Sequence, residues 1–204
     1  MSTYKFTYFN IRGLGETSRY IFALAGQEYE DIRIDIADWN TFKETTPLGQ
    51  LPFLEVDGHR IPQSMAIHRY LGRKFDLYGG SDIEKAQIDV VLDILNDLNA
   101  QAGKATYEQD EEVKQRFRKE LIEVQGPKYL AMLEKRLTAN QGGDGFFVGS
   151  KISIADLAVF NWMHDRLSDL KIVNKEPKLQ AHAERVKALP QIDAWLKKRP
   201  VTNV

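Results

Sequence analysis

The β-strand signals of this 204-residue sequence all lie near its N-terminus, and this restricts the possible folds more than any other feature. They form four short runs, at residues 4–10, 29–36, 51–56 and 59–61. The first two alternate apolar and polar side chains, and the third is short and apolar. The Asp57-Gly58 pair is a hairpin signal, and Pro52 fits only at the start or edge of a strand. We therefore predict that the third and fourth strands pair antiparallel.

Helical patterns fill the gaps between these strands. The segment "GETSRYIFALAG" places Tyr20 and Leu24 on one helix face and ends at Gly26, so the first two strands enclose a helix. A short helix is expected before the third strand, and apolar residues recur at helical spacing from Ile67 to Phe75. This order resembles a thioredoxin-like domain, which we place at residues 1–76.

The rest of the chain shows helical periodicity and no strand signal. The segment "LYGGSD" is a glycine-containing linker, and an all-helical domain is expected at residues 82–204. Within it, Gly126-Pro127 should kink or break a helix. Ser153 and Asp156 fit a variant of the helix capping box, which gives Asp156 a structural role. The expected fold is an α/β domain followed by a helical bundle.

Composition and charge exclude several classes of function. The 28 basic and 29 acidic residues give a net charge of -1, which offers no electrostatic footprint for nucleic acid or an anionic membrane. The N-terminus lacks a secretory signal, and no apolar run approaches the roughly 20 residues of a transmembrane helix, so we expect a cytoplasmic protein. Because the chain has no cysteine, any sulfur chemistry must use the sulfur of a substrate.

Motifs of other enzyme classes fit poorly. "GLGETS", with Asp35 further on, superficially matches a nucleotide-binding loop, but Ser18 replaces its third glycine and no further βαβ units follow. The four histidines are scattered, and "PQSMA" is not the nucleophile elbow of a serine hydrolase. We therefore predict neither a metal site nor a serine triad.

Tyr8 is a candidate catalytic residue at the end of the first strand. From periodicity alone it is one more strand aromatic. However, α/β folds place ligands where strand ends face helix N-termini, and a phenol there can donate a hydrogen bond to a sulfur. A free thiol has a pKa of roughly 8.5, so such a donor would favour the thiolate.

The polar Gln63-Ser64 pair separates the hairpin from the closing helix. Ser64 is a plausible helix N-cap, which alone explains its presence. In addition, the free N–H groups at a helix N-terminus attract an anion such as an amino-acid carboxylate. Pro52 fixes a nearby turn, and a cis peptide bond there would turn the backbone of Leu51 outward to pair with an extended peptide.

Three carboxylates form a stripe in the helical domain, because Asp89, Asp93 and Asp97 recur every fourth residue. Like charges at this spacing repel by a few tenths of a kcal/mol per pair. A solvated face is the default for two of them, and a cationic amine or a partner subunit could compensate the third. A metal site is disfavoured, because carboxylates along one helix do not surround an ion.

Several segments together resemble the cytosolic glutathione transferases, most closely the sigma class, over essentially the whole chain. They are "YKFTYFNIRG", "ADW" followed by Lys43, "GQLPFLEVDG", "PQSMAI", "GGDGFFVGSKISIADL" and "KKRP". The resemblance implies a homodimer in which Tyr8 stabilises the thiolate of glutathione, the co-substrate, with no bound cofactor. It implies conjugation of glutathione to small hydrophobic electrophiles and reduction of lipid hydroperoxides.

The resemblance also assigns roles in glutathione binding. Trp39 and Lys43 would meet its glycyl end, and Leu51 would pair through its backbone with the cysteinyl part. Gln63 and Ser64 would hold the γ-glutamyl carboxylate, and Asp97 would reach across the dimer to the γ-glutamyl amine. Gln50 should line the same site. The electrophile pocket would comprise Gly13, Leu14, Asn99, Gly103, Lys104 and Tyr107.

Two alternatives come with the same resemblance. The sigma lineage includes lens crystallins that keep the fold with little activity, although the intact Tyr8 argues against this role. The lineage also includes prostaglandin D synthases, which typically carry an arginine and a tryptophan where this chain has Leu14 and Lys104. That isomerase activity is therefore disfavoured.

Overall fold

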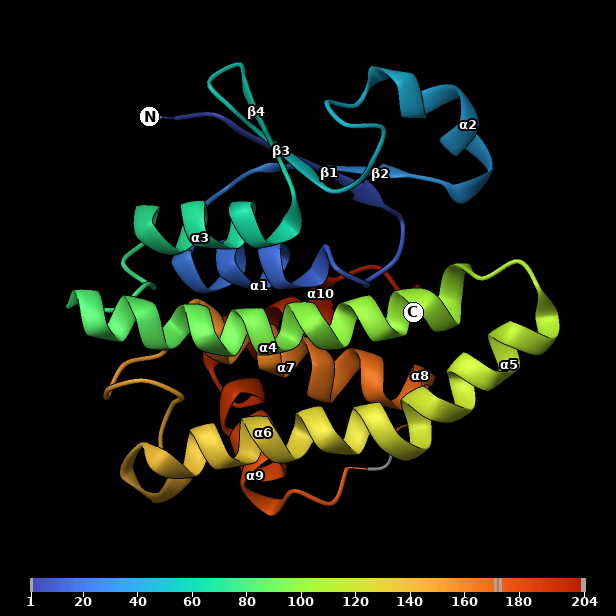
Figure 1. The fold of residues 1–204 in the computed structure, drawn as a ribbon. Coiled ribbons are helices and arrows are strands. Elements are labelled where there is room, and N and C mark those ends of the chain that lie inside the picture. Colours follow the sequence, from blue (N-terminus) through green and yellow to red (C-terminus); the bar gives the residue numbers. More distant parts are fainter. Residues whose placement is uncertain (1, 171, 173, 203–204) are drawn as a thin grey trace. The chain divides into compact units, whose positions relative to one another are not determined.

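The computed structural model describes residues 2–170, 172 and 174–202. The chain forms two compact units, one built on the β-sheet and one of helices (Figure 1). The first unit extends to Leu77 and resumes at Ala188, and the second comprises Tyr78–Lys187.

A four-stranded sheet organises the first unit. Its strands are β1 (Tyr4–Phe9), β2 (Glu30–Ile34), β3 (Phe53–Val56) and β4 (His59–Pro62), in the order β2-β1-β3-β4. β1 pairs parallel with β2, whereas β1 with β3 and β3 with β4 are antiparallel. The predicted hairpin and the thioredoxin-like arrangement are thus confirmed. In the turn of the hairpin, Asp57 and Gly58 both adopt positive φ.

The described part of the first unit also contains four α-helices. They are α1 (Glu16–Ala25), α2 (Trp39–Phe42), α3 (Ser64–Lys74) and α10 (Pro190–Lys198), with short 3-10 turns at Ile36–Asp38 and Lys43–Thr45. α1 packs beside α3 and α10, and α3 contacts β3 and β4. The predicted stop at Gly26 is a left-handed C-cap whose N–H donates to carbonyls of the last turn of α1.

The second unit is helical, as expected from its periodicity. Its α-helices are α4 (Asp82–Tyr107), α5 (Glu111–Glu120), α6 (Gly126–Ala139), α7 (Ile154–Phe160), α8 (Leu167–Leu170) and α9 (Pro177–Lys187). A 3-10 turn lies at Gln141–Gly143. Two turns of π-helix, Leu121–Gln125 and Asn161–Arg166, join α5 to α6 and α7 to α8.

The predicted kink at Gly126-Pro127 takes the form of one of these π-turns. Gln125 and Gly126 keep right-handed helical angles, so the chain continues from α5 into α6 without a break. Because Pro127 lacks an N–H, it cannot donate to the preceding turn, and a widened turn just before it accommodates that loss.

The C-terminal helix α10 lies against the first unit, with which residues 188–202 are grouped by their contacts, and the predicted division at residues 82–204 stays a prediction. The physical reason for this grouping is the packing of α10 on α1, where Trp195 and Arg199 donate hydrogen bonds to Glu16 at 2.8 and 3.0 Å. Helical periodicity identifies the apolar face of α10 but not the surface that covers it.

Candidate functional site

Most of the predicted site residues lie at one edge of the sheet, where β1, β2 and β4 end and β3 begins. Thr7, Phe53 and Pro62 are aligned across β1, β3 and β4 by the observed register. The neighbouring positions therefore come to the same edge, and they include Tyr8, Leu51 and Gln63. β2 ends at this edge too, because Ile34 pairs with Phe9. Ligands in α/β folds bind at such strand ends.

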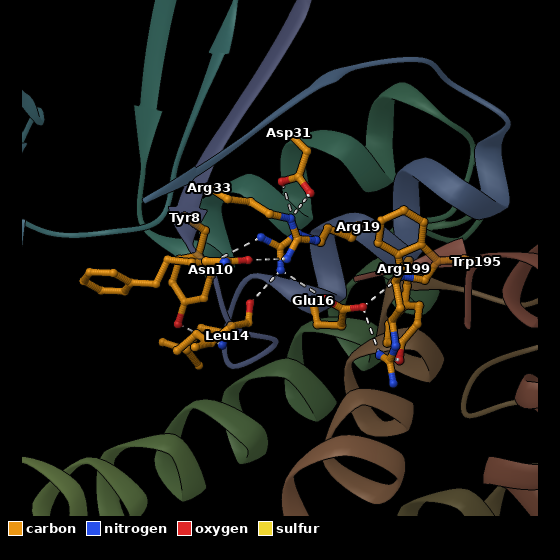
Figure 2. Close-up of polar contacts among 12 residues, drawn as sticks. Tyr8, Asn10, Leu14, Glu16, Arg19, Asp31, Arg33, Trp195 and Arg199 are labelled. Atoms are coloured by element: carbon orange, nitrogen blue, oxygen red, sulfur yellow. Dashed lines mark hydrogen bonds and ion pairs between the residues drawn. The ribbon is translucent and has the colours of Figure 1, made fainter. Parts of the chain in front are cut away.

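Tyr8 is held by the loop that follows β1. The backbone N–H of Leu14 donates to the Tyr8 hydroxyl oxygen at 3.1 Å (Figure 2). A Cβ on Gly13, where φ is +42°, would lie 2.7 Å from that oxygen, and one on Gly15 would lie 2.3 Å from Cδ1 of the ring. Only glycines let the loop approach so closely. Because a phenol both accepts and donates, an oxygen that accepts from Leu14 can still donate its proton to a ligand.

A buried arginine lies behind Tyr8. The guanidinium carbon of Arg19 is 5.9 Å from the Tyr8 ring centroid and 5.7 Å from that of Phe6. Figure 2 shows this side chain between the loop and Asp31, to which its Nε donates at 3.2 Å. The strand that carries Tyr8 thus rests against a fixed positive charge.

A chain of aromatic rings connects Tyr8 to α2. Tyr8 and Phe9 contact edge to face at 5.7 Å between centroids, and Phe9 contacts Trp39 in the same way at 5.2 Å. Lys43 follows α2 in an exposed 3-10 turn. A Cβ on Gly49 would lie 3.4 Å from its Cε, so the lysine stem runs close to the loop before Gln50. The structure therefore brings Trp39 to the end of β1 and Lys43 to the segment that leads into β3.

A polar pair lies where β3 begins and β4 ends. Gln63 Nε2 donates to Gln50 Oε1 at 3.4 Å, so these two predicted residues meet across the loop. The Leu51-Pro52 peptide bond between them in sequence is cis. Gln63 has φ of 74°, a left-handed conformation uncommon outside glycine, asparagine and aspartate.

The N-terminus of α3 begins next to this pair. The N-cap is Gln63, whose carbonyl accepts from Ile67 N–H at 3.0 Å, and Ser64 is the first helical residue rather than the predicted cap. The first N–H groups of a helix lack intrahelical acceptors and carry the positive end of its dipole. The exposed Gln63 and half-buried Ser64 are therefore placed where an anion would be stabilised.

The remaining predicted residues lie on α4 in the second unit. Asn99, Gly103 and Tyr107 share one face by their spacing of four, and Tyr107 is 75% exposed. Asn99 Oδ1 accepts from Trp162 Nε1 at 3.1 Å and from Arg166, whose guanidinium stacks on the Trp162 ring. Asn99 is thus fixed by neighbours of its own unit.

Two further predicted residues on α4 have exposed side chains. Lys104 donates to Gln101 Oε1 at 3.3 Å. Asp97 is exposed, whereas Asp89, two turns earlier in the carboxylate stripe, accepts from Tyr78 Oη at 2.6 Å. Two members of the stripe therefore have different surroundings, and Asp97 is presented to solvent in a single copy of the chain.

The capping box at Asp156 serves the core of the second unit. Its carboxylate accepts from the N–H groups of Ser153 and Phe147, both at 2.8 Å, and meets His182 Nε2 at 2.9 Å. Asp156 and His182 are both 0% exposed. These contacts join α7, α9 and the loop before α7, as the predicted structural role requires.

Two other features are absent from the described residues, a metal-binding cluster and a membrane-spanning helix. No group of three or more His, Cys, Asp or Glu side chains is gathered there in a way that could hold a metal ion. Among the helices of the same residues, none combines the length and apolar character needed to cross a membrane.

Comparison with known proteins adds the family. The family model for the N-terminal domain of glutathione S-transferases matches residues 4–73, and the model for the C-terminal domain of the same family matches residues 96–199. The chain belongs to the glutathione S-transferase family. The N-terminal match includes the sheet edge from Tyr8 to Ser64, and the C-terminal match includes the predicted residues of α4.

Individual members of the family cover the chain from end to end. It is 41% identical to probable glutathione S-transferase 5 of Caenorhabditis elegans, over 99% of both chains. It is 40% identical to the hematopoietic prostaglandin D synthase of Gallus gallus, over 100% of both. The crystal structure of a major nematode-specific transferase from C. elegans superimposes with a TM-score of 0.89 at 41% identity, over 100% of both chains.

Sequence reasoning missed the charged residues behind Tyr8. Glu16 and Arg19 lie three residues apart on the predicted helix, a spacing that normally marks an exposed ion pair. In the structure both are buried. The only available signal was their position, directly after the glycine loop and on the same helix as the apolar Tyr20.

Proposed function

We propose that this member of the glutathione S-transferase family binds glutathione along the sheet edge and stabilises its thiolate with Tyr8. The observation that carries the proposal is the Tyr8 hydroxyl, held by Leu14 N–H under two glycines at the ends of the strands. Each unit by which the thiol pKa falls corresponds to about 1.36 kcal/mol of preference for the thiolate. A phenol donor in a fixed position can supply part of that preference without reorganising.

The neighbouring residues suit the three parts of the tripeptide. Trp39 and Lys43 would hold the glycyl carboxylate, for which Lys43 supplies a positive charge. The backbone of Leu51 would pair with the cysteinyl part. Gln63 and Ser64, with the N–H groups at the start of α3, would hold the γ-glutamyl carboxylate, and Gln50 would line that end.

In the proposed reaction, the thiolate sulfur attacks an electrophilic carbon. With 1-chloro-2,4-dinitrobenzene, the sulfur–carbon bond forms, the carbon–chlorine bond breaks and chloride leaves, while the thiol proton has already passed to solvent. Rate would come from positioning and from the lowered thiol pKa. The residues proposed to contact the electrophile are Gly13, Leu14, Asn99, Gly103, Lys104 and Tyr107. Reduction of lipid hydroperoxides is proposed as a second reaction of the same thiolate.

The assembly and setting belong to the same proposal. We propose a homodimer of the sigma class that works in the cytoplasm in detoxification of lipid peroxidation products. In it, Asp97 would contact the γ-glutamyl amine bound by the partner subunit. The exposed carboxylate of Asp97 supports this assignment.

Prostaglandin isomerisation is the second candidate activity, and the 40% identity to an avian prostaglandin D synthase favours it. Leu14 and Lys104 argue against it, since both differ from the residues expected in that branch. A product assay on prostaglandin H2 separates the two activities: a D-type product would establish the isomerase, and its absence with active conjugation would establish the general transferase.

The decisive experiment measures initial rates of glutathione addition to 1-chloro-2,4-dinitrobenzene across pH, for the wild type and Tyr8→Phe. The phenylalanine keeps the ring but removes the donor, so turnover should fall and the apparent thiol pKa should rise while glutathione still binds. Identical pH profiles in the two proteins would refute the role of Tyr8. No activity in either, with glutathione bound, would favour a crystallin-like structural role.

A further inference from the structure

The first turn of α1 contains a buried ion pair that is not among the proposed contacts to glutathione. The side chains of Glu16 and Arg19 are 1% and 0% exposed, and Arg19 Nη1 donates to Glu16 Oε2 at 3.1 Å. Burying two charges costs free energy unless further hydrogen bonds satisfy them. The further partners of this pair therefore indicate what it holds in place.

Besides Glu16 and Asp31, Arg19 has two partners at the end of β1 and in the loop that follows it, which fixes Tyr8. Arg19 Nη1 donates to the carbonyl of Ile11 at 2.8 Å, and Nη2 donates to that of Phe9 at 3.5 Å. The same guanidinium lies beside the Tyr8 ring. Arg19 thus holds the start of the segment 9–14 in place. The end of the same segment carries Leu14, whose N–H donates to the Tyr8 hydroxyl.

The partners of Glu16 come from the far end of the chain. Its Oε1 accepts from Trp195 Nε1 at 2.8 Å and from Arg199 Nη1 at 3.0 Å. Arg199 Nη1 also donates to the Tyr20 hydroxyl at 2.9 Å. Figure 2 shows this sequence of contacts, from Arg199 and Trp195 through Glu16 to Arg19. All of them lie within the first unit.

We propose that Glu16, Arg19, Trp195 and Arg199 form a positioning network that orients Tyr8 for thiolate stabilisation. The inference rests on the proposed function of Tyr8 and adds four residues to it. Glu16 accepts from Arg19 with one oxygen and from the C-terminal donors with the other, so its orientation depends on both ends of the chain. The position of Arg19, and with it the loop, then depends on residues that never touch the substrate.

The competing explanation is that the network only fastens the C-terminus to α1. Both explanations predict that mutations lower the melting temperature. Only the positioning role predicts a change in the pKa of the glutathione thiol in the binary complex, because that pKa depends on the geometry of the Tyr8 hydroxyl. The ultraviolet absorbance of the bound thiolate, titrated against pH, measures it without turnover.

Three substitutions in the 204-residue chain, with a fourth as a control, separate the contributions. Trp195→Phe keeps an aromatic ring and removes one donor to Glu16, and Arg199→Met removes the charged donor. Arg199→Lys restores a cation and should rescue part of the effect. Lys197→Gln is the matched control, since it breaks an exposed ion pair with Asp193 on the same helix but does not reach Glu16.

We expect Trp195→Phe and Arg199→Met to raise the bound thiol pKa. Their kcat/KM at neutral pH should fall roughly 10-fold, with KM for glutathione nearly unchanged, because small misplacements of a reacting group act on the transition state. Lys197→Gln should match the wild type. Trp195→Phe is the milder change, so it remains informative if Arg199→Met does not fold.

The outcomes distinguish the inference from the proposed function. If Tyr8→Phe raises the bound thiol pKa but Trp195→Phe and Arg199→Met lower only the melting temperature, the network is structural and the inference is overturned alone. If Tyr8→Phe leaves that pKa unchanged, the proposed role of Tyr8 fails and the inference fails with it. A raised bound thiol pKa in Tyr8→Phe, Trp195→Phe and Arg199→Met, with partial recovery in Arg199→Lys, supports both the inference and the proposed function.

Discussion

At the scale of single residues, the Tyr8 site depends on two glycines, Gly13 and Gly15, which have no Cβ atom. Gly13 and Gly15 leave no room for a Cβ, because the ring and hydroxyl of Tyr8 fill that space. The glycines therefore do more than permit a turn. They let the backbone pack directly on the ring and bring Leu14 N–H within hydrogen-bonding distance of the oxygen.

Gly15→Ala should accordingly damage both stability and activity. Its Cβ would lie 2.3 Å from Cδ1 of Tyr8, so the ring or the loop must move. We expect a loss of about 1–3 kcal/mol in the free energy of unfolding and of roughly 10- to 100-fold in kcat/KM. Urea denaturation and conjugation rates test this. Gly145→Ala is the control, since its Cβ would meet nothing nearer than 3.7 Å; equal behaviour of the two variants would contradict the packing argument.

His68 on α3 makes stability depend on pH. Burial, reinforced by the charge of Arg69, lowers the pKa of His68 from 6.5 to about 3. The folded protein therefore resists protonation of this ring more than the unfolded chain does. Its contribution to stability is complete above pH 6.5 and is lost as the pH falls toward 3.

His68→Leu removes that titration. We expect its unfolding free energy to fall less steeply with acidification than that of the wild type, by a slope equivalent to about one proton. Urea midpoints measured from neutral pH down to about pH 4 give both slopes. The difference in unfolding free energy between the two proteins at neutral pH, where His68 is neutral in the folded protein, measures the change in packing alone. Parallel slopes would show that His68 is not the group responsible.

At the scale of elements, the sequence allowed the position of the sheet edge to be predicted. It did not reveal that a buried ion pair and the C-terminal helix pack behind that edge. Alternation locates the first two strands, and the Asp57-Gly58 turn predicts the antiparallel pairing of β3 with β4. The ends of the predicted strands then locate Tyr8 and the Gln63-Ser64 pair, whereas the pairing of β1 with β3 comes from the structure. The buried Glu16–Arg19 pair was not predictable, because local spacing does not reveal burial. Nor was the docking of α10 on α1, which depends on contacts across nearly the full sequence.

The start of α7 provides a test of an element's boundary. Asp156 accepts from two backbone N–H groups and contacts His182, all without solvent. Asp156→Ala should cost about 3 kcal/mol or more, because it leaves several buried donors unsatisfied. Asp110→Ala, which removes an exposed cap of α5, should cost only about 1 kcal/mol.

Urea denaturation of both variants measures that difference. The conjugation rate per folded molecule should stay at the wild-type level in Asp156→Ala, since the residue belongs to the core of the second unit. A variant that remains stable but loses turnover would contradict the structural role and indicate a part in the reaction.

At the scale of the whole molecule, the proposed homodimer makes each active site depend on two copies of the chain. In a symmetric dimer the same interface residues are contributed twice. Asp97 is exposed in the single chain and is proposed to reach the glutathione bound by the partner. Asp97→Asn should therefore raise KM for glutathione with little change in kcat, whereas Asp93→Asn, one turn earlier on α4, should affect KM less.

Mixed dimers test this arrangement directly. A dimer of one Tyr8→Phe chain and one Asp97→Asn chain would contain one site with both defects and one site with neither. At limiting glutathione it should recover about half of the wild-type activity, although each parent homodimer is impaired. If Asp97 instead served its own chain, both sites of the mixed dimer would carry one defect, and activity would equal the mean of the two parents. A monomer in sedimentation would remove the basis for the role of Asp97, while leaving Tyr8 and the sheet edge to act within one chain.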